Sequence, residues 1–315
     1  MNETSLLSSA FLTALFSSGV RQSIPLIYGS VGDTVSERSG VMGIALEGEM
    51  LFGAFFSYLF ALRTGSLWVG VLMGAVAGML SSLIVAVWSV LFRQDQSIVG
   101  IMFNILATGF TNFLNRMIFG TSNANISIDT FQPIAIPGLS KIPVLGEIFF
   151  NQDILAYLSV VLAAAVFFVL RRTKLGLQLG AVGENPRAAQ AAGIRVYRVR
   201  VLAYMFCGFA AGVAGASLTL STVGSFTEAI SAGRGFICLA IVILSRWNPL
   251  TALVASFGFG SIQALQIRLQ VQGSALPYQV FVALPYLITV LVLALAGHNI
   301  RAPRELGVPF EKESR

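Results

Sequence analysis

Apolar stretches of about 20 residues alternate with short polar segments along the chain, a pattern typical of membrane-spanning helices. A segment inside a bilayer must satisfy its own backbone hydrogen bonds, and unbroken apolar runs favour helices over barrel strands. We therefore expect an all-α, polytopic transmembrane helical bundle with about nine spans. These cover residues 7–30, 40–62, 64–92, 96–119, 154–170, 201–222, 235–244, 249–267 and 278–296. Residues 235–247 are short for a full span, so a half-helix or re-entrant piece buried in protein stays open there.

Basic residues are concentrated in one polar segment, residues 171–200. They are Arg171, Arg172, Lys174, Arg187, Arg195, Arg198 and Arg200. Because cytoplasmic loops carry an excess of Lys and Arg, this segment is expected to be cytoplasmic. The segment 120–153 has one lysine against three acidic residues and is expected to be extracytoplasmic. Counting spans then gives an outside N-terminus, a single transmembrane domain over 1–300 and a cytoplasmic tail over 301–315.

Composition excludes a soluble enzyme. Hydrophobic residues make up 56% and charged residues 11% of the 315 residues, with a mean hydropathy of +0.80. A soluble domain carries about 25% charged residues. The net charge of +6 is accounted for by topology and does not indicate nucleic-acid binding. Cys207 and Cys238 lie in apolar stretches and are expected to pack as small hydrophobic side chains.

Signatures of catalysis and metal binding are absent from the sequence. None of the three lysines belongs to a G-x-x-x-x-G-K-[ST] phosphate loop, His298 is the only histidine, and no G-x-S-x-G motif occurs. We expect no catalytic residue, no metal site and no cofactor. The predicted class is a transporter, a channel or a transporter subunit.

Two stripes of small residues predict close helix packing. They are Gly70, Gly74 and Gly78 in one span, and Gly208, Gly212 and Ala216 in another. Small residues at i, i+4 and i+8 let helix backbones approach closely. Packing within the chain is favoured over a dimer interface.

Within the basic segment, the residues Gly-Glu-Asn-Pro at 183–186 predict a turn and a helix start. Asn185 is the expected cap, and Pro186 suits the first helical turn. A short alanine-rich helix then covers 187–192, and Gly193 ends it in a left-handed conformation. This helix has few large apolar residues, so docking to a protein partner is favoured over lying on a membrane surface.

This segment closely resembles the cytoplasmic coupling-helix loop of ABC-importer permeases of the ribose and branched-chain amino acid type. The resemblance is closest to the nucleoside and simple-sugar branch, in particular to the shorter of its two permeases, which lacks an extra leading helix. Further matches lie at Ser36–Val41, Leu46–Gly48, Met50–Phe55, Asn104, Gly233–Ile237, Trp247–Pro249 and Leu284–Leu287.

The resemblance implies a multi-pass permease subunit in the bacterial cell (inner) membrane that moves a nucleoside. The implied partners are an ABC ATPase subunit that hydrolyses ATP, a second, longer permease in a heterodimer, an extracytoplasmic solute-binding protein or lipoprotein, and membrane lipid. No nucleic acid is expected. The ATPase-coupling residues carried over are Gly183, Glu184, Asn185, Pro186, Arg187, Ala188, Ala189, Ala192 and Gly193.

Other functions stay open at this point. A simple sugar or a branched-chain amino acid is the alternative solute. An autonomous secondary transporter and a membrane scaffold are the alternative classes. The sequence also departs from the family pattern at Gly43, Ala45 and Glu49, where an asparagine, a glycine and an apolar residue are usual. These departures lie in the expected pathway helix and leave the exact solute open.

Polar residues inside the predicted spans are the candidates for a solute pathway: Glu47, Asn104, Asn112, Asn115, Gln263 and Gln266. Asn112 and Asn115 share a helix face with Asn104 roughly aligned, and Gln263 and Gln266 form a similar pair. A polar path for an uncharged solute and hydrogen bonding between helices both account for such a stripe.

Two glutamates in the second span are expected to have different surroundings. Glu47 and Glu49 lie about 200° apart around a helix, so they face different surroundings. Structural pairing is favoured over solute contact for Glu47, with Arg21 as its suggested partner. Glu49 is expected to face another subunit or to stay protonated.

Overall fold

The structure is a computed structural model that describes residues 9–120, 127–271 and 301–311, and in addition the helical residues 279, 283, 285, 287–291 and 294. The longer helices are α1 (Ser9–Arg38), α2 (Leu46–Thr64), α3 (Leu67–Ala86), α4 (Gln96–Phe119), α6 (Ile154–Arg172), α9 (Val196–Ser217), α10 (Arg234–Leu244) and α11 (Pro249–Val271). Short elements are α5 (Leu145–Phe149), α7 (Lys174–Glu184), α8 (Pro186–Ala191) and the strands β1 (Ile134–Ala135) and β2 (Asn151–Gln152).

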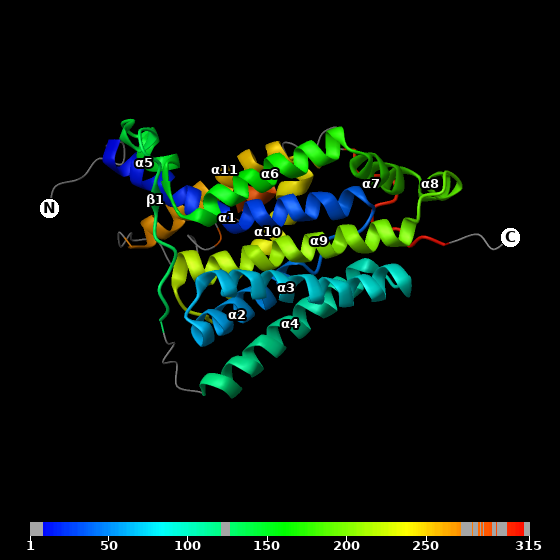
Figure 1. Cartoon of the computed structure of the whole chain (residues 1–315), viewed down its shortest axis with the longest axis horizontal. Coiled ribbons are helices and arrows are strands. Elements are labelled where there is room, and N and C mark those ends of the chain that lie inside the picture. Colours follow the sequence, from blue (N-terminus) through cyan, green and yellow to red (C-terminus); the bar gives the residue numbers. More distant parts are fainter. Residues whose placement is uncertain are drawn as a thin grey trace.

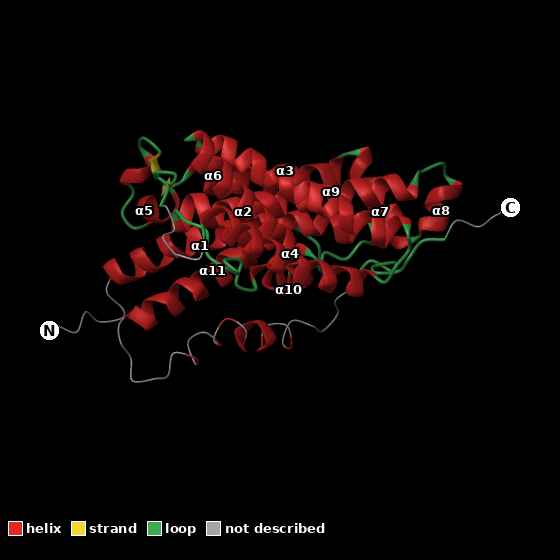
Figure 2. Ribbon diagram, turned by 90° about the horizontal axis from the view of Figure 1, so that it is seen from below, coloured by secondary structure: helices red, strands yellow, loops and turns green. Residues whose placement is uncertain are grey.

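The long helices run side by side along the length of the molecule (Figure 1). One end carries α7, α8 and residues 301–311, and the opposite end carries α5, β1 and the start of α1. Figure 2 shows that the strands are confined to the end with α5, where β1 and β2 pair antiparallel. The two ends are therefore built differently, although the helices between them form one body.

Five helical segments of the described chain are long and apolar enough to cross a membrane. They are Leu67–Leu91, Gln96–Phe119, Ile154–Arg172, Val196–Val223 and Pro249–Gln270, two of which end in π-helical turns. The segment that contains α9 lies at the centre, because 72% of its span is buried, whereas only 28% of the span of α4 is buried. The predicted span 278–296 lies mostly outside the described residues.

Most predicted helices are present with shifted ends. The prediction of 96–119 agrees with α4, and α10 has eleven residues, as its short apolar stretch indicates. The first span was predicted over residues 7–30, and the helix that contains it, α1, continues beyond that range to Arg38. Its last two turns lie inside the bundle, where Asp33, Thr34 and Ser36 are fully buried.

The two stripes of small residues pack against each other, which confirms packing within the chain. A Cβ added to Gly78 of α3 would meet the carbonyl oxygen of Gly208 and the backbone of Gly212, both on α9. A Cβ added to Gly212 would in turn meet the carbonyl oxygen of Gly74, so the two helices touch along their backbones. One buried apolar cluster then joins residues from α1, α2, α9, α10 and α11 around this contact.

The described part of segment 120–153 folds over the end of α9 and its π-helical turn. The N–H groups of Ile128 and Phe131 donate to the carbonyl oxygens of Gly224 and Leu220 at 2.8 and 2.9 Å. Burial raises the pKa of the Asp153 carboxyl, which caps α6 by accepting a hydrogen bond from the Ala156 N–H at 2.9 Å. This segment is thus a structured cover and not an extended loop.

Candidate functional site

The predicted coupling segment is a hairpin of two short helices, α7 and α8. Asn185 separates them, and its Oδ1 accepts a hydrogen bond from the Ala188 N–H at 3.0 Å, with Pro186 in the first turn of α8. Gly193 follows with a φ of +85°. The expected cap and helix stop are therefore present. Gly183 and Glu184 belong to α7 and not to a turn, because the helical hydrogen bonds continue to Asn185.

The two faces of α8 have different surroundings. Pro186 and Ala189 are buried against the rest of the molecule, whereas Arg187, Ala188 and Ala191 are exposed. A Cβ added to Gly183 would meet the carbonyl oxygen of Arg38, so the glycine lets α7 pass directly over the end of α1. The exposed face consists of small alanine side chains and the side chain of Arg187.

Residues 301–311, called the C-terminal segment below, bind to this hairpin. The Glu305 N–H donates to the Gly183 carbonyl at 3.0 Å, and the Gly307 N–H donates to the Gly40 carbonyl at 3.1 Å. The Tyr197 hydroxyl donates to the Phe310 carbonyl at 3.0 Å. The sequence predicted only a hydrophilic tail, although Val308 and Phe310 were the signal that part of it is apolar.

Arg200 joins the C-terminal segment to the end of α1. Its side chain is 1% exposed, with Nε donating to the Ser39 carbonyl at 3.2 Å and Nη1 to the Val308 carbonyl at 2.8 Å. From the sequence, Arg200 was expected only as one of the basic residues of a polar loop. In the structure it is buried near the start of α9 and donates the two hydrogen bonds given above. It therefore fixes three parts of the chain at one point.

Glu47 caps α10 from a neighbouring helix. Its Oε1 accepts from the Ser231 hydroxyl at 2.5 Å and the Gly233 N–H at 2.8 Å, and its Oε2 accepts from the Gly235 N–H at 2.7 Å. These are N–H groups that a helix start leaves without partners, and a carboxylate there also complements the helix dipole. Within the described residues no ion pair joins Arg21 to Glu47, so that suggested pairing is wrong.

Glu49 points to the other side of α2, as expected from its position. It is fully buried within the chain, so it does not face another subunit. Its carboxyl lies beside the buried Tyr204 hydroxyl, and within the described residues no Lys or Arg forms an ion pair with it. Asp33 and Glu37 of α1 are buried in the same region, where the Trp247 indole donates to Glu37 at 2.6 Å. The Asp33 carboxyl also occupies the space that a side chain at Gly43 would need, which accounts for the glycine there.

Asn104 ties α4 to the start of α2. Its Oδ1 accepts from the Gly48 N–H and its Nδ2 donates to the Ile44 carbonyl, both at 2.8 Å. Since α2 begins without a side-chain cap of its own, this amide satisfies backbone groups at the helix start. Hydrogen bonding between helices is the role that the geometry gives this residue.

The remaining pathway candidates lie on two helices that are not neighbours. Asn112 and Asn115 are partly buried on α4, which packs mainly on α2, and Gln263 and Gln266 lie on α11, which packs mainly on α1. The Oδ1 of Asn112 and the Oε1 of Gln263 are buried without a hydrogen-bond partner. The chain by itself does not bring the asparagines and glutamines together around one cavity.

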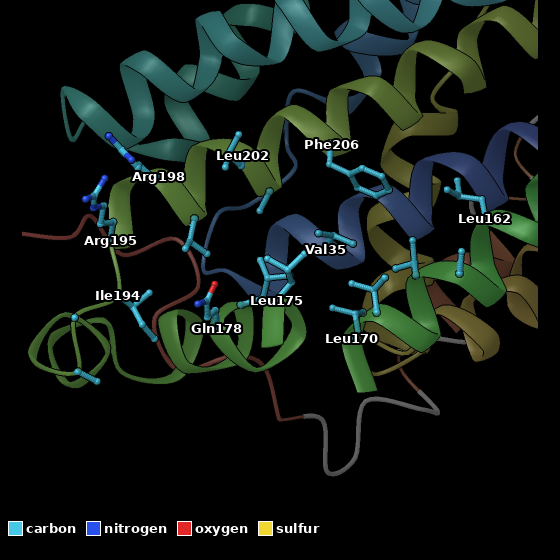
Figure 3. Close-up of a pocket in the computed structure, with 18 residues that line it drawn as sticks. Val35, Leu162, Leu170, Leu175, Gln178, Ile194, Arg195, Arg198, Leu202 and Phe206 are labelled. Carbon is cyan, nitrogen blue, oxygen red and sulfur yellow. The ribbon is translucent and has the colours of Figure 1, made fainter. Parts of the chain in front are cut away.

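A cavity of about 720 Å³ separates the α7–α8 hairpin from α9 (Figure 3). Its walls are mainly apolar, with Leu170, Leu175, Leu202 and Phe206, and Arg198 also lines it. None of the polar pathway candidates lines it. The cavity therefore lies beside the hairpin and apart from the predicted pathway residues.

Comparison with known proteins gives a consistent family. A profile described as "Branched-chain amino acid transport system / permease component" matches residues 15–293. The guanosine ABC transporter permease protein NupQ of Bacillus subtilis (strain 168) is 38% identical over 304 residues, covering 92% of this chain and 94% of that relative. The nucleoside ABC transporter permease protein NupC of Lactococcus lactis subsp. cremoris (strain MG1363) is 38% identical over 301 residues, with the same coverage of 92% and 94%.

Two weaker similarities add to this. The nucleoside ABC transporter permease protein NupB of the same Lactococcus strain is 27% identical over 255 residues, covering 76% of this chain and 68% of that protein. A solved metal-chelate type ABC transporter in an inward-facing conformation superimposes with a TM-score of 0.51 at 16% identity, covering 91% of this chain and 85% of that one. The structural similarity concerns the fold alone.

Proposed function

The chain belongs to the family of permease components of branched-chain amino acid transport systems, and from this premise we propose that it is a permease subunit of an ABC importer for nucleosides. The observation that carries the solute is 38% identity, over 92% of this chain, with permeases named for guanosine and for nucleosides. ATP hydrolysis is assigned to a separate ABC ATPase subunit, since the sequence has no phosphate-binding loop.

The proposed membrane arrangement has about nine crossings in the bacterial inner membrane, with the N-terminus outside. The basic residues of 171–200 support a cytoplasmic position for α7 and α8. The segment 120–153 is then extracytoplasmic and is the proposed docking surface for a solute-binding protein or lipoprotein. The tail 301–315 is cytoplasmic, and residues 1–300 form one permease domain.

We assign ATPase coupling to the α7–α8 hairpin. Its exposed face presents Arg187, Ala188, Ala192 and Gly193, and its buried face rests on the ends of other helices. A push on such a short, firmly capped helix is passed directly to the backbone at Gly183 and Arg38, which nearly touch. The ATPase subunit would drive the change from an outward-open to an inward-open pathway by this contact.

The second, longer permease is proposed to complete the pathway on the side of α4. This helix has the least buried of the five spans, and its outer face exposes Met102, Ile105 and Phe113. Asn112 and Asn115 flank that face and are the pathway residues we propose first. Glu47 and Asn104 rank below them, because their polar atoms are already hydrogen bonded within the chain.

Uptake in proteoliposomes tests the solute. The complex is reconstituted with its ATPase subunit, second permease and binding protein, and uptake of guanosine, ribose and leucine is compared with and without ATP. We expect ATP-dependent uptake of the nucleoside alone. Uptake of ribose or leucine without nucleoside uptake would assign the chain to the sugar or amino acid alternative.

Copurification tests the partners. The tagged chain is purified in mild detergent, and the accompanying proteins are identified by mass spectrometry. An ABC ATPase subunit and a second permease are the expected companions. A chain that is consistently alone, and that transports in response to an ion gradient without ATP, would be a secondary transporter instead.

A further inference from the structure

We infer that the C-terminal segment is a positioning element for the α7–α8 hairpin, and that Phe310 is its central residue. The inference rests on the proposed coupling role of that hairpin. It concerns how a push on α8 reaches the helices of the bundle, not which solute is moved.

The packing of the hairpin on the bundle is interrupted on one side. Toward α9 and α6 lies the cavity of about 720 Å³, and Leu175 and Gln178 of α7 face it across from Leu202 and Phe206 (Figure 3). The buried Leu179 of α7 still packs with Ala203 of α9 beside this gap. Protein interiors are close-packed, so a gap of this size weakens the packing of α7 on α9, and further contacts are needed to fix the position of the hairpin.

The C-terminal segment supplies the missing support. Phe310 is 5% exposed and packs in one cluster with Val182 of α7, Ala189 of α8 and Val196 of α9. Its ring lies against the ring of Tyr197 with the centroids 5.4 Å apart. This cluster thus joins the C-terminal segment to both helices of the hairpin and to the helix that enters the bundle.

Hydrogen bonds fasten the part of the segment that precedes Phe310. The Glu305 N–H donates to the Gly183 carbonyl in α7, and the Gly307 N–H donates to the Gly40 carbonyl, in the turn between α1 and α2. The buried Arg200 of α9 donates to the Val308 carbonyl. The segment therefore joins the hairpin to α1, α2 and α9, the helices that form the centre of the bundle.

This arrangement gives Phe310 a role in coupling. When a partner pushes on α8, the open cavity would let the hairpin tilt toward α9 without moving the bundle. The C-terminal segment opposes that tilt, because Phe310 fills the space behind Ala189. Movement of α8 is then transmitted to α1 and α9.

The test compares Phe310→Ala with Phe310→Leu and with Val308→Ala. The last is a matched control, since Val308 is 44% exposed and both of its hydrogen bonds are made by its backbone, which the substitution keeps. Hydrogen exchange of residues 186–193 is measured in the purified chain, and solute moved per ATP hydrolysed is measured in the assembled complex.

In Phe310→Ala, exchange is expected to rise about tenfold, because a local contact that holds α8 closed is lost. The transport ratio is expected to fall severalfold while assembly and ATP hydrolysis persist. Phe310→Leu restores most of the ratio, and Val308→Ala behaves like the wild type. If Phe310→Ala does not assemble, Tyr197→Phe, which removes one hydroxyl, should show the same changes to a smaller extent.

Unchanged exchange, or an unchanged transport ratio despite faster exchange, would overturn the positioning role. The solute assignment fails in a different way, when the wild-type complex hydrolyses ATP but moves no nucleoside. In that event exchange at 186–193, together with ATP hydrolysis by the assembled complex, still decides the role of the C-terminal segment.

Discussion

At the scale of single residues, two glutamates on α2 show how little the residue type says without its surroundings. Glu47 accepts three hydrogen bonds at the start of α10, whereas Glu49 is fully buried without an ion pair in the described part of the chain. Both are in the first turn of the same helix. The first residue stabilises the fold as a carboxylate, and the second costs free energy when it is charged.

Exchanging each carboxylate for its amide isostere should therefore have opposite effects. Glu47→Gln replaces one acceptor oxygen by a donor that faces backbone N–H groups, and we expect a loss of about 1–3 kcal/mol of stability. Glu49→Gln removes a buried charge that no cation of the described chain neutralises, so the stability of this variant should equal or exceed that of the wild type. Thermal unfolding of the purified chain in detergent measures both. Equal losses in the two variants would contradict the capping role of Glu47.

The asparagines of α4 also differ in role: Asn104 is assigned to the stability of the fold, and Asn115 is proposed for the solute pathway. Asn104→Ala leaves the Gly48 N–H and the Ile44 carbonyl without partners, which should cost about 1–3 kcal/mol for each buried group. Asn115→Ala, the matched change on the same helix, should leave the unfolding temperature nearly unchanged. Uptake assays complete the comparison, since Asn115→Ala should reduce nucleoside uptake in a folded complex. A stable Asn104→Ala, or normal uptake by Asn115→Ala, would refute the respective assignment.

At the scale of helices, capping residues predicted the helix ends that depend only on neighbouring residues in the sequence. The bounds of α4 follow from Asp95, whose carboxylate accepts from the Ser97 and Ile98 N–H groups at 2.8 and 3.0 Å, and from Gly120 after the last turn. The cap of α8 at Asn185 is equally local. By contrast, α1 continues through Asp33 because distant helices bury that residue, and hydropathy alone does not contain this information.

At the candidate site, too, local features could be predicted from the sequence, and long-range contacts could not. Glu47 was expected to have a structural partner, but its partners lie at 231–235, where nothing in the local sequence points back to α2. The C-terminal segment was missed for the same reason, since it binds Gly40 and Gly183, which are far away in the chain. Long-range contacts of irregular backbone have no periodic pattern to reveal them.

The end of α8 offers a test of the coupling role at this scale. Gly193 has a φ of +85°, and a Cβ added there would meet no other atom, so Gly193→Val strains the backbone without a steric clash. A left-handed conformation costs a residue with a Cβ about 1–2 kcal/mol, and more when it is β-branched. We expect transport and its coupling to ATP hydrolysis to fall while membrane assembly persists.

Gly180→Val in α7 is the matched control for that change. Gly180 also has open space around a Cβ, but its backbone is helical, so the same side chain is added without the strain. Uptake and ATP hydrolysis are measured for both variants in the assembled complex. Normal transport by Gly193→Val would remove the coupling role from residues 187–193.

At the scale of the whole molecule, the two ends differ in charge as well as in structure. Arg171, Arg172 and Lys174 are exposed at the end with α7, and Asp129 and Glu147 belong to the segment at the other end. Excess basic charge marks the cytoplasmic side, so the charge pattern and the hairpin indicate the same orientation. Both features are independent of which solute is carried.

Labelling of single cysteines tests that orientation with a matched pair. Glu147 and Glu184 are both exposed, and replacing either by cysteine removes the same charge, whereas the native Cys207 and Cys238 are fully buried. A membrane-impermeant maleimide added to intact spheroplasts should label Glu147→Cys at once and Glu184→Cys only after lysis. Labelling of Glu184→Cys in intact cells would put α8 on the side that lacks ATP. No ATPase subunit could then reach the hairpin, and the coupling role would be lost together with the orientation.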